Sequence, residues 1–476
     1  MGNRSSFLIT IALILAYVIF ICVTGSNDYW YHFAFLMCIL QFHIVPKAAL
    51  LFPLIACLTL SEFYFVVMEK RVYLCELLFY PLVVNYFFIL NKKRIDKIWG
   101  QLILLCLLIT FFQALNFLFY SDFTASFFRV RTLVFPVIII GIVVNLVKSK
   151  EDLKRMINLV IIVSMISVLV VFMQFITGKF YVLQTEEFLN SDEKFFLAGY
   201  LESTADSLFF QLFGLKIKGP IPPVGLNYYK FGFSEKIIMP MAICASLALY
   251  SKKRSKKYLL VALFAAQFVA TLLTGSRSVL VTALCIVFVL ILFYTKKFKW
   301  RLIEGTIAFF FLVIYFIAPF LTIIGGEELG TLASRVFYLD EFFKYIYSNP
   351  MVLITGSNAD AFIKFSNAEQ PPHHFIAFGI ISDGLIITLV IVTIIFILLK
   401  RITFFTTLDK EILAIGYGLW AGIFGFIFVY GQTSYLTWAI PHNMYFLFMI
   451  GLLIAVYRIT AVPKLRMKNL SLLNVS

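Results

Sequence analysis

Charged residues are scarce in this chain: they make up 14% of its 476 residues, whereas a soluble globular domain carries about 25%. Hydrophobic residues make up 62%, and apolar runs recur almost from one end to the other. Runs of about 17 to 25 residues are what a helix needs to cross the hydrocarbon core of a bilayer. The composition therefore excludes a water-soluble protein and predicts one membrane domain over residues 1–476.

The apolar runs also lack the alternation of polar and apolar residues that marks a membrane β-barrel. Inside hydrocarbon, the backbone N–H and C=O groups of a spanning segment must bond within that segment unless strands close into a barrel. The spans are therefore expected to be helices. The predicted fold class is all-α, that of a polytopic integral membrane protein.

Paired cysteine motifs are absent too. None of the seven cysteines forms a Cys-x-x-Cys pair and all lie within apolar runs, so the sequence indicates neither a disulfide framework nor a zinc site. The sequence has no Asp-x-Asp motif and no cluster of histidines with the spacing of metal ligands. We expect neither a metal nor another cofactor.

Basic residues give a net charge of +15, but they do not line one amphipathic face, which argues against a nucleic-acid partner. They form six short clusters between apolar runs, a pattern that indicates membrane topology. With the N-terminus inside, every cluster falls on the cytoplasmic side: 92–97, 148–155, 252–257, 296–301, 400–410 and 458–468. The pattern predicts about 12 to 14 transmembrane helices and cytoplasmic N- and C-termini.

The predicted spans lie near residues 7–24, 29–45, 48–67, 72–90, 98–119, 132–147, 156–177, 234–250, 258–274, 279–294, 302–323, 379–399, 412–429 and 444–457. Two long external loops follow from this count, at 178–233 and 324–378. Glu69, Lys70 and Arg71 also fall outside, which leaves open that the third and fourth spans are re-entrant or wrongly divided. The two halves share no internal repeat, which disfavours an inverted-repeat transporter.

Arg277 is an external cation at the tip of a hairpin, in the segment Thr274–Ser278. The positive-inside rule disfavours this position, so another interaction is expected to favour it. Gly275 permits a tight turn, and a guanidinium is well shaped to bind a phosphate with two parallel hydrogen bonds. Contact with lipid headgroups is the alternative.

The segment Ser334–Ser348 is predicted to form an amphipathic helix on the membrane surface. Its apolar face comprises Val336, Leu339, Phe343, Ile346 and Tyr347. Ser334 is the expected N-cap, and Asn349 and Pro350 end the helix. Arg335 then lies in the first turn, where the helix dipole does not favour a cation, which points to a functional role.

Two adjacent histidines, His373 and His374, follow a double proline and precede a further span. Near a helix N-terminus the dipole disfavours the imidazolium form, which keeps a neutral imidazole available as a general base. A structural or headgroup-binding role is the alternative. His442 and Asp28 are rival external candidates.

Inside the spans, Glu62 and Glu76 either satisfy helix contacts or line a polar cavity or ion path.

Three stretches resemble the O-antigen ligase and polymerase superfamily of bacterial membrane glycosyltransferases. Thr274–Ser278 is similar to the family's Gly-Ser-Arg signature, and 334–356 to its Arg, amphipathic helix, Pro and Gly pattern. His373 followed by Gly384 is similar to its His-Asn segment and acidic-Gly pair. The resemblance covers about 274–390. His374 stands where the family usually has Asn, so which histidine is the base stays open.

The resemblance implies a metal-independent glycan transfer at the periplasmic face of the bacterial inner membrane, with both long loops periplasmic. The donor would be an undecaprenyl-diphosphate-linked oligosaccharide and the acceptor a glycan hydroxyl. Arg277 and Arg335 would bind the diphosphate, and His373 would take the proton. Lys230, near the end of the first long loop, would add positive charge.

A polymerase is favoured over a ligase, because the acidic and aromatic loop 178–233 suits a second glycan site. Membrane lipids and a chain-length regulator are further candidate partners. From a different class, a polysaccharide flippase or transporter is the alternative. A transporter would be expected to line a path through the membrane with polar residues or broken helices.

Overall fold

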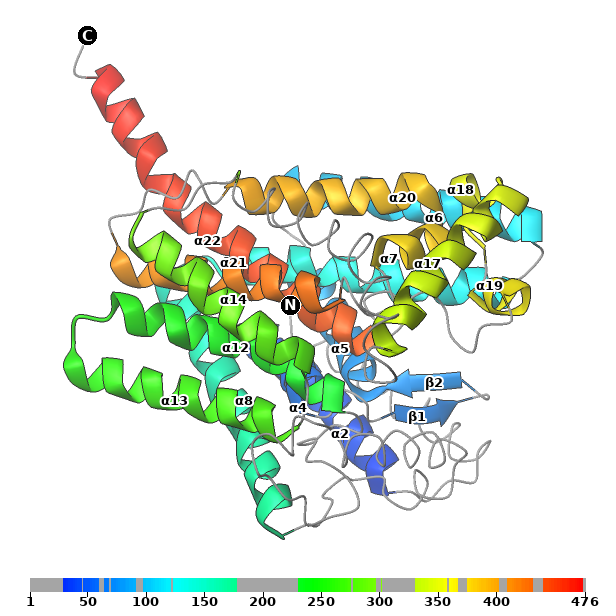
Figure 1. The fold of residues 1–476 in the computed structure, drawn as a ribbon. Coiled ribbons are helices and arrows are strands. Elements are labelled where there is room, and N and C mark those ends of the chain that lie inside the picture. Colours follow the sequence, from blue (N-terminus) through cyan, green and yellow to red (C-terminus); the bar gives the residue numbers. More distant parts are fainter. Residues whose placement is uncertain are drawn as a thin grey trace.

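The computed structural model describes residues 29–44, 46–59, 64–67, 70–90, 97–120, 123–177, 230–274, 277–296, 301, 330–357, 359–366, 375–401, 409–430 and 440–473. These ranges form a bundle of helices with one β-hairpin (Figure 1). The helices are α2 (Tyr29–His43), α3 (Pro46–Ala49), α4 (Leu51–Thr59), α5 (Leu74–Leu90), α6 (Lys97–Tyr120), α7 (Phe123–Leu146), α8 (Lys150–Thr177), α12 (Lys230–Tyr250), α13 (Arg254–Leu273), α14 (Arg277–Tyr294), α17 (Gly330–Ser348), α18 (Val352–Thr355), α19 (Ala359–Ser366), α20 (Phe375–Lys400), α21 (Lys410–Tyr430) and α22 (Ile440–Leu473).

The length and apolar composition of the helices support a membrane protein. Within the described residues, six are long and apolar enough to cross a bilayer, and six shorter apolar helices accompany them. These twelve coincide with predicted spans, and the other two predicted spans, 7–24 and 302–323, lie outside the described residues. Large apolar side chains remain exposed on the outside of the bundle, such as Leu104 at 68% and Leu118 at 71%. Apolar surface of this kind is typical of proteins that contact a membrane or another protein.

The β-hairpin corrects the third predicted span. Helix α4 ends at Thr59, and the chain then forms antiparallel strands β1 (Tyr64–Val67) and β2 (Lys70–Tyr73) before α5 begins. The aromatic and β-branched residues of β1 favour a strand, and pairing satisfies the backbone without a continuous helix. The prediction of one helical span over 48–67 is therefore wrong at its second half. Lys70 and Arg71 belong to strand β2.

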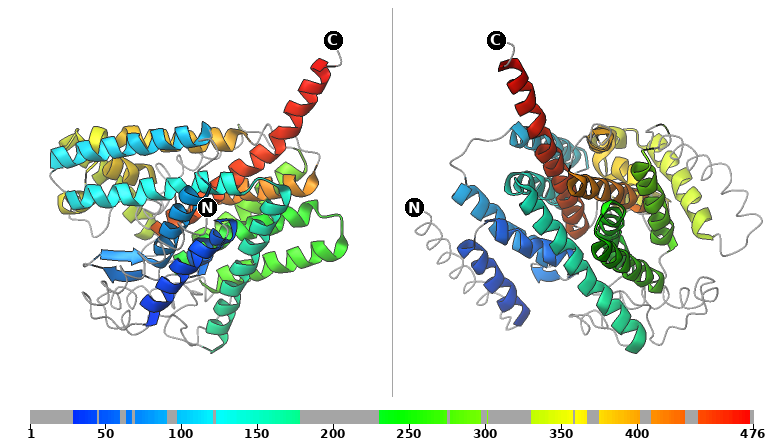
Figure 2. Two further views of the ribbon diagram at one scale, coloured as in Figure 1. Left: turned by 180° about the vertical axis from the view of Figure 1, so that it is seen from behind. Right: turned by 90° about the vertical axis from the view of Figure 1, so that its left-hand side faces the viewer.

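Glycines allow the central helices to approach closely. A Cβ on Gly418 of α21 would lie 2.7 Å from the Cα of Ile243 in α12, and one on Gly422 would lie 3.0 Å from the Cα of Met239. Small residues at such contacts are typical of membrane helix pairs, where van der Waals packing replaces the hydrophobic driving force. Helix α7 packs against both α6 and α22 (Figure 2).

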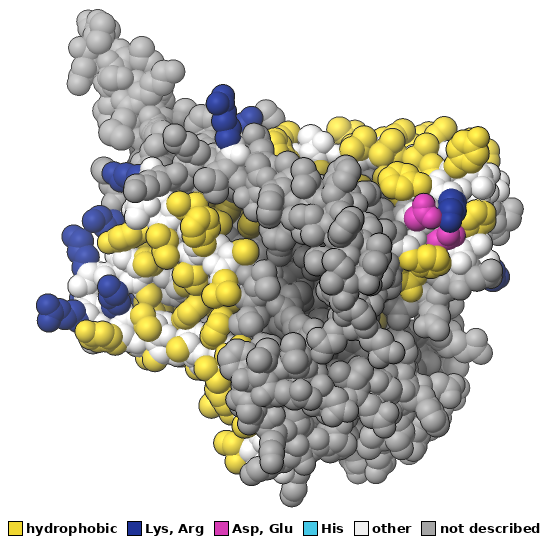
Figure 3. Space-filling model, viewed as in Figure 1, with side chains coloured by type: hydrophobic (Ala, Val, Ile, Leu, Met, Phe, Trp, Pro, Cys, Tyr) yellow, Lys and Arg dark blue, Asp and Glu magenta, His cyan; other side chains and the backbone are white. Residues whose placement is uncertain are grey.

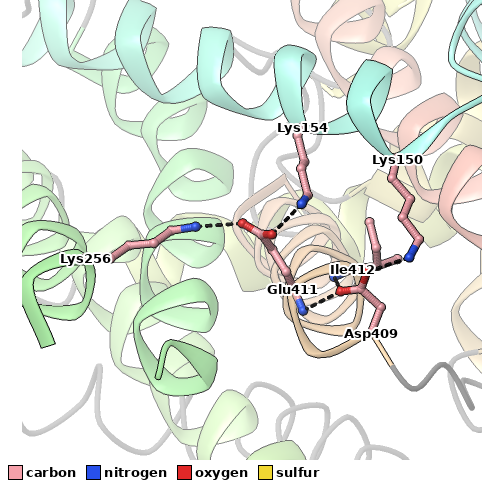
Figure 4. A network of polar contacts seen from close by, with 6 residues as sticks. All are labelled: Lys150, Lys154, Lys256, Asp409, Glu411 and Ile412. Atoms are coloured by element: carbon pink, nitrogen blue, oxygen red, sulfur yellow. Dashed lines mark hydrogen bonds and ion pairs between the residues drawn. The ribbon is translucent and has the colours of Figure 1, made fainter. Parts of the chain in front are cut away.

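Three of the basic clusters meet at one end of the bundle (Figure 4). There Lys154 of α8 and Lys256 of α13 both bind Glu411 of α21, at 2.5 and 2.6 Å. Lys150 lies 2.6 Å from Asp409, next to them. This places the clusters at 148–155, 252–257 and 400–410 together, as the topology count predicts. Exposed Lys and Arg side chains gather along this edge of the molecule, beside a broad apolar surface (Figure 3).

Other contacts bring further helix ends to this basic end. The ring of Tyr250, at the end of α12, lies 5.4 Å from that of Tyr294, at the end of α14. The hydroxyl of Tyr457 donates to the carbonyl of Leu398 near the end of α20, at 3.1 Å. Trp99 at the start of α6 packs against Gly141 near the end of α7. The described helix ends next to these clusters therefore lie on one side of the bundle.

Asp409 caps α21 at this end. Its Oδ1 accepts hydrogen bonds from the backbone N–H groups of Glu411 and Ile412, at 3.0 and 3.2 Å. Partial burial opposes ionisation, but the Lys150 ammonium and these N–H groups outweigh it and hold the pKa of Asp409 below its ordinary value. The resulting stabilisation is present above the ordinary Asp pKa of about 3.9 and is lost as the pH falls below it.

Asp409→Ala is expected to lower the free energy of unfolding by about 1 kcal/mol, because the first turn of α21 loses its cap and Lys150 its partner. The measurement is the unfolding transition of the purified protein in detergent at neutral pH. Lys410→Ala changes the neighbouring exposed residue and serves as the control. Equal transitions for the two variants would contradict the capping role.

Candidate functional site

Two of the candidate cations stand at the first residue of a helix. Lys230 begins α12 and Arg277 begins α14, and both helices end at the basic end of the bundle. The backbones of Lys230 and Arg277 therefore lie at the opposite ends of these helices. Their side chains lie outside the described residues, as does Gly275. The predicted hairpin put Arg277 at its tip; in the structure α13 ends at Leu273 and the backbone of Arg277 already begins α14.

The histidines and their rivals are described only in part. His373 and His374 lie outside the described residues, and Phe375, the next residue, begins α20. His442 lies in the first turn of α22, but its side chain is outside the described part of the chain. Its neighbour Asn443 is buried and donates to the carbonyl of Thr132 in α7, at 3.3 Å. Asp28 lies outside the described residues.

Helix α17 agrees with the predicted amphipathic helix at its end and differs at its start. The N–H of Asn349 bonds the carbonyl of Tyr345 at 2.9 Å, and Pro350 follows, so the predicted stop is confirmed. The helix begins at Gly330, however, so Ser334 lies inside it. The N-cap prediction for Ser334 is wrong, because the preceding Gly-Thr-Leu-Ala segment continues the helix. Arg335 consequently lies in the second turn, and its side chain is outside the described residues.

The faces of α17 also differ from the prediction. Phe342 and Tyr345, both 4% exposed, face the protein and pack in a cluster with residues of α18, α19 and α20. Phe343 and Tyr347 point outward, at 56% and 91% exposed. An outward aromatic strip beside the exposed ion pair of Lys344 and Asp340 suits a helix at the membrane surface (Figure 3).

The two motif segments that end in glycine meet in the structure. Gly356 follows α18 with φ +72°, and Gly384 interrupts α20 with φ +83°. A Cβ on Gly384 would lie 2.5 Å from the carbonyl oxygen of Ile354, and one on Gly356 would lie 2.6 Å from the backbone of Ser382. Segments well separated in the sequence thus form one direct backbone contact, which we call the glycine clasp (Gly356 and Gly384).

Helix α20 doubles back at Gly384. A Cβ on Gly379 would lie 2.9 Å from Oγ1 of Thr388, whereas these two residues would be roughly 13 Å apart along a continuous helix. The span predicted over 379–399 is therefore not one straight helix. The part after Gly384 runs alongside α6, where Ile387 packs in a cluster with Ile109 (Figure 1).

Buried polar groups from other helices surround the glycine clasp. Gln113 Nε2 donates to Asp383 Oδ1 at 3.2 Å, and Asn116 Nδ2 donates to the carbonyl of Thr355 at 2.9 Å. From α17, the Tyr345 hydroxyl donates to Ser357 Oγ at 3.0 Å. Sequence reasoning missed Gln113 and Asn116. The sequence feature that could have identified them is the presence of two amides within an apolar span, three residues apart and so on one helix face.

Glu76 is fully buried and bound to Arg131. Its two carboxylate oxygens accept hydrogen bonds from Nε and Nη2 of Arg131, each at 2.5 Å. The Tyr80 hydroxyl donates to the same carboxylate at 2.8 Å. Of the two readings of Glu76, the helix contact inside the bundle is the one confirmed. Glu62 lies outside the described residues.

The described residues contain no group of three or more His, Cys, Asp or Glu side chains placed to hold a metal ion. The described part of the site contains the non-helical backbone at Gly356 and Gly384, the buried amides of Gln113 and Asn116, and the buried carboxyl group of Asp383. No protein-family model matches the chain, and no curated protein or solved structure matches it either.

Proposed function

We propose that this protein is an O-antigen polymerase, or the equivalent for another surface polysaccharide, in a bacterial inner membrane. The observation that carries the proposal is the glycine clasp. Gly356 and Gly384 end two of the three stretches that resemble the glycosyltransferase superfamily, and they are in contact. Contact between them is expected if both stretches serve one site.

In the proposed reaction, the acceptor hydroxyl attacks the anomeric carbon of the donor sugar while the bond to the lipid diphosphate breaks. His373 takes the hydroxyl proton as general base. Arg277 and Arg335 stabilise the negative charge that develops on the diphosphate leaving group. Lys230 adds positive charge for the glycan or diphosphate. The site would face the periplasm, with both termini in the cytoplasm.

Deleting the gene and separating the cells' lipopolysaccharide on a gel tests the proposal. A polymerase is expected to leave a single repeat unit on the core when it is lost, and complementation with the intact chain restores the ladder. Bare core with accumulated lipid-linked polymer would identify a ligase instead. A normal ladder in the deletion strain would overturn both.

His373→Ala is expected to slow polymer formation by about 10² to 10⁴-fold, the usual contribution of a general base. His374→Ala is the matched control and is expected to retain the ladder. Both variants are compared in the deletion strain at equal protein level. If His373→Ala keeps the ladder and His374→Ala loses it, the base is His374. If both keep it, His442→Ala is the next variant.

A further inference from the structure

Helix α6 carries two amides that bind the two halves of the glycine clasp. Gln113 and Asn116 are 1% and 5% exposed and share one face of α6. Asp383, which Gln113 binds, directly precedes Gly384. Thr355, which Asn116 binds, directly precedes Gly356. Each amide therefore anchors the residue before a glycine that has a left-handed conformation.

Both hydrogen bonds are buried inside the protein, because Thr355 and Asp383 are 0% and 1% exposed. A polar group that loses a hydrogen-bond partner at a buried position is costly, since bulk water does not replace that partner. The bond to Asp383 has an ionised acceptor when this carboxyl is deprotonated, and such bonds are about twice as strong as neutral ones. Both donors belong to one helix, α6. This helix therefore fixes the distance between the residues that precede Gly356 and Gly384.

Both chain segments that carry candidate site residues lead into the glycine clasp. Helix α17, which contains Arg335, leads through Asn349 into α18 and Thr355. His373 and His374 lead directly into α20, whose first part ends at Asp383. We propose that Gln113 and Asn116 are positioning residues, which hold these two segments in register for glycan transfer. The role in transfer rests on the proposed function, whereas the clamp itself does not.

A reciprocal exchange tests the clamp. Gln113→Glu places two carboxyl groups opposite each other and removes the donor, so polymer formation is expected to fall by about tenfold to a hundredfold. Adding Asp383→Asn to Gln113→Glu restores an amide opposite a carboxylate with the same side-chain lengths. The double variant is expected to return to within roughly threefold of the natural chain. Gln101→Glu, an exposed position on the same helix, is the control and is expected to have no effect.

The readout is the polysaccharide ladder in the deletion strain, at matched protein level. A double variant that stays as defective as Gln113→Glu would overturn the positioning role, because the exchanged pair would then not substitute for the original one. Asn116→Leu, which removes the other bond, is expected to reduce the ladder as well. A normal ladder in Asn116→Leu would also count against the proposal.

Hydrogen exchange of the purified protein separates this inference from the proposed function. The N–H of Ser357 donates to the carbonyl of Ile381 across the clasp. Its protection is expected to fall in Gln113→Glu and to return in the double variant. If the deletion strain has a normal ladder, the proposed function fails while this pattern still supports the clamp. Unchanged protection in Gln113→Glu would overturn the clamp itself.

Discussion

Gly384→Ala is expected to lower the free energy of unfolding by about 2 to 6 kcal/mol. A positive φ strains an alanine by about 1 to 3 kcal/mol, and an overpacked contact costs a similar amount. The new Cβ would lie 2.5 Å from the carbonyl oxygen of Ile354 and 2.9 Å from its carbonyl carbon. These are backbone atoms, so no side-chain rotation relieves the overlap. The clasp must open or α20 must change direction.

Gly100→Ala is the matched control for Gly384→Ala. Gly100 is exposed on α6, and a Cβ there would meet no atom within 4 Å in the described part of the chain. Alanine favours a helix over glycine, so this variant is expected to be neutral or slightly stabilised. Thermal unfolding in detergent compares the two. Similar transitions for both would mean that the clasp is not a constraint on the fold.

Arg131→Met is expected to destabilise the protein by about 3 to 5 kcal/mol, the usual cost of breaking a buried ion pair by removing one partner. The Glu76 carboxylate is 0% exposed and would lose both hydrogen bonds from the guanidinium. Only the Tyr80 bond to this carboxylate would remain among the bonds described here. Helices α5 and α7 would then face each other across an uncompensated charge.

Removing the charge on both sides separates the ion pair from packing. Glu76→Gln combined with Arg131→Met leaves no net charge at the site and keeps an acceptor for Tyr80. This double variant is expected to recover most of the lost stability, because a neutral replacement of a buried pair is often tolerated. Lys344→Met, which breaks two surface ion pairs on α17, is the control and should unfold close to the natural chain. If the double variant lost as much stability as the two single substitutions together, the pairing of Glu76 with Arg131 would be contradicted.

The helix ends follow from the sequence where a polar boundary is sharp. Helix α13 ends at Leu273 and α14 begins at Arg277, close to the predicted limits, because Gly275 and Arg277 interrupt the apolar run. The basic clusters likewise predict which helix ends share a side. Charge near a span end is a local property, so it can be read without knowing which helices are neighbours.

Pairings between helices do not follow from the sequence. A uniformly apolar span gives no periodicity to show which face meets protein, so neither Arg131 for Glu76 nor Gln113 for Asp383 could be named. The break at Gly384 was missed for a related reason. Glycine is common in membrane helices, and only the contact with Ile354 shows that this one requires a positive φ.

The cluster around Glu411 and Asp409 bears on the order in which the chain is inserted. Helices α8 and α13 precede α21 in the chain, so their lysines emerge from the ribosome before the two acids do. In the proposed topology, with both termini in the cytoplasm, Lys154 and Lys256 would lack their acidic partner in α21 during that interval and would act as signals that retain their segments on the cytoplasmic side. When α21 arrives, Glu411 binds both lysines and offsets one of their two positive charges (Figure 4). In that topology the same lysines would first orient the early segments and then hold a late helix in place.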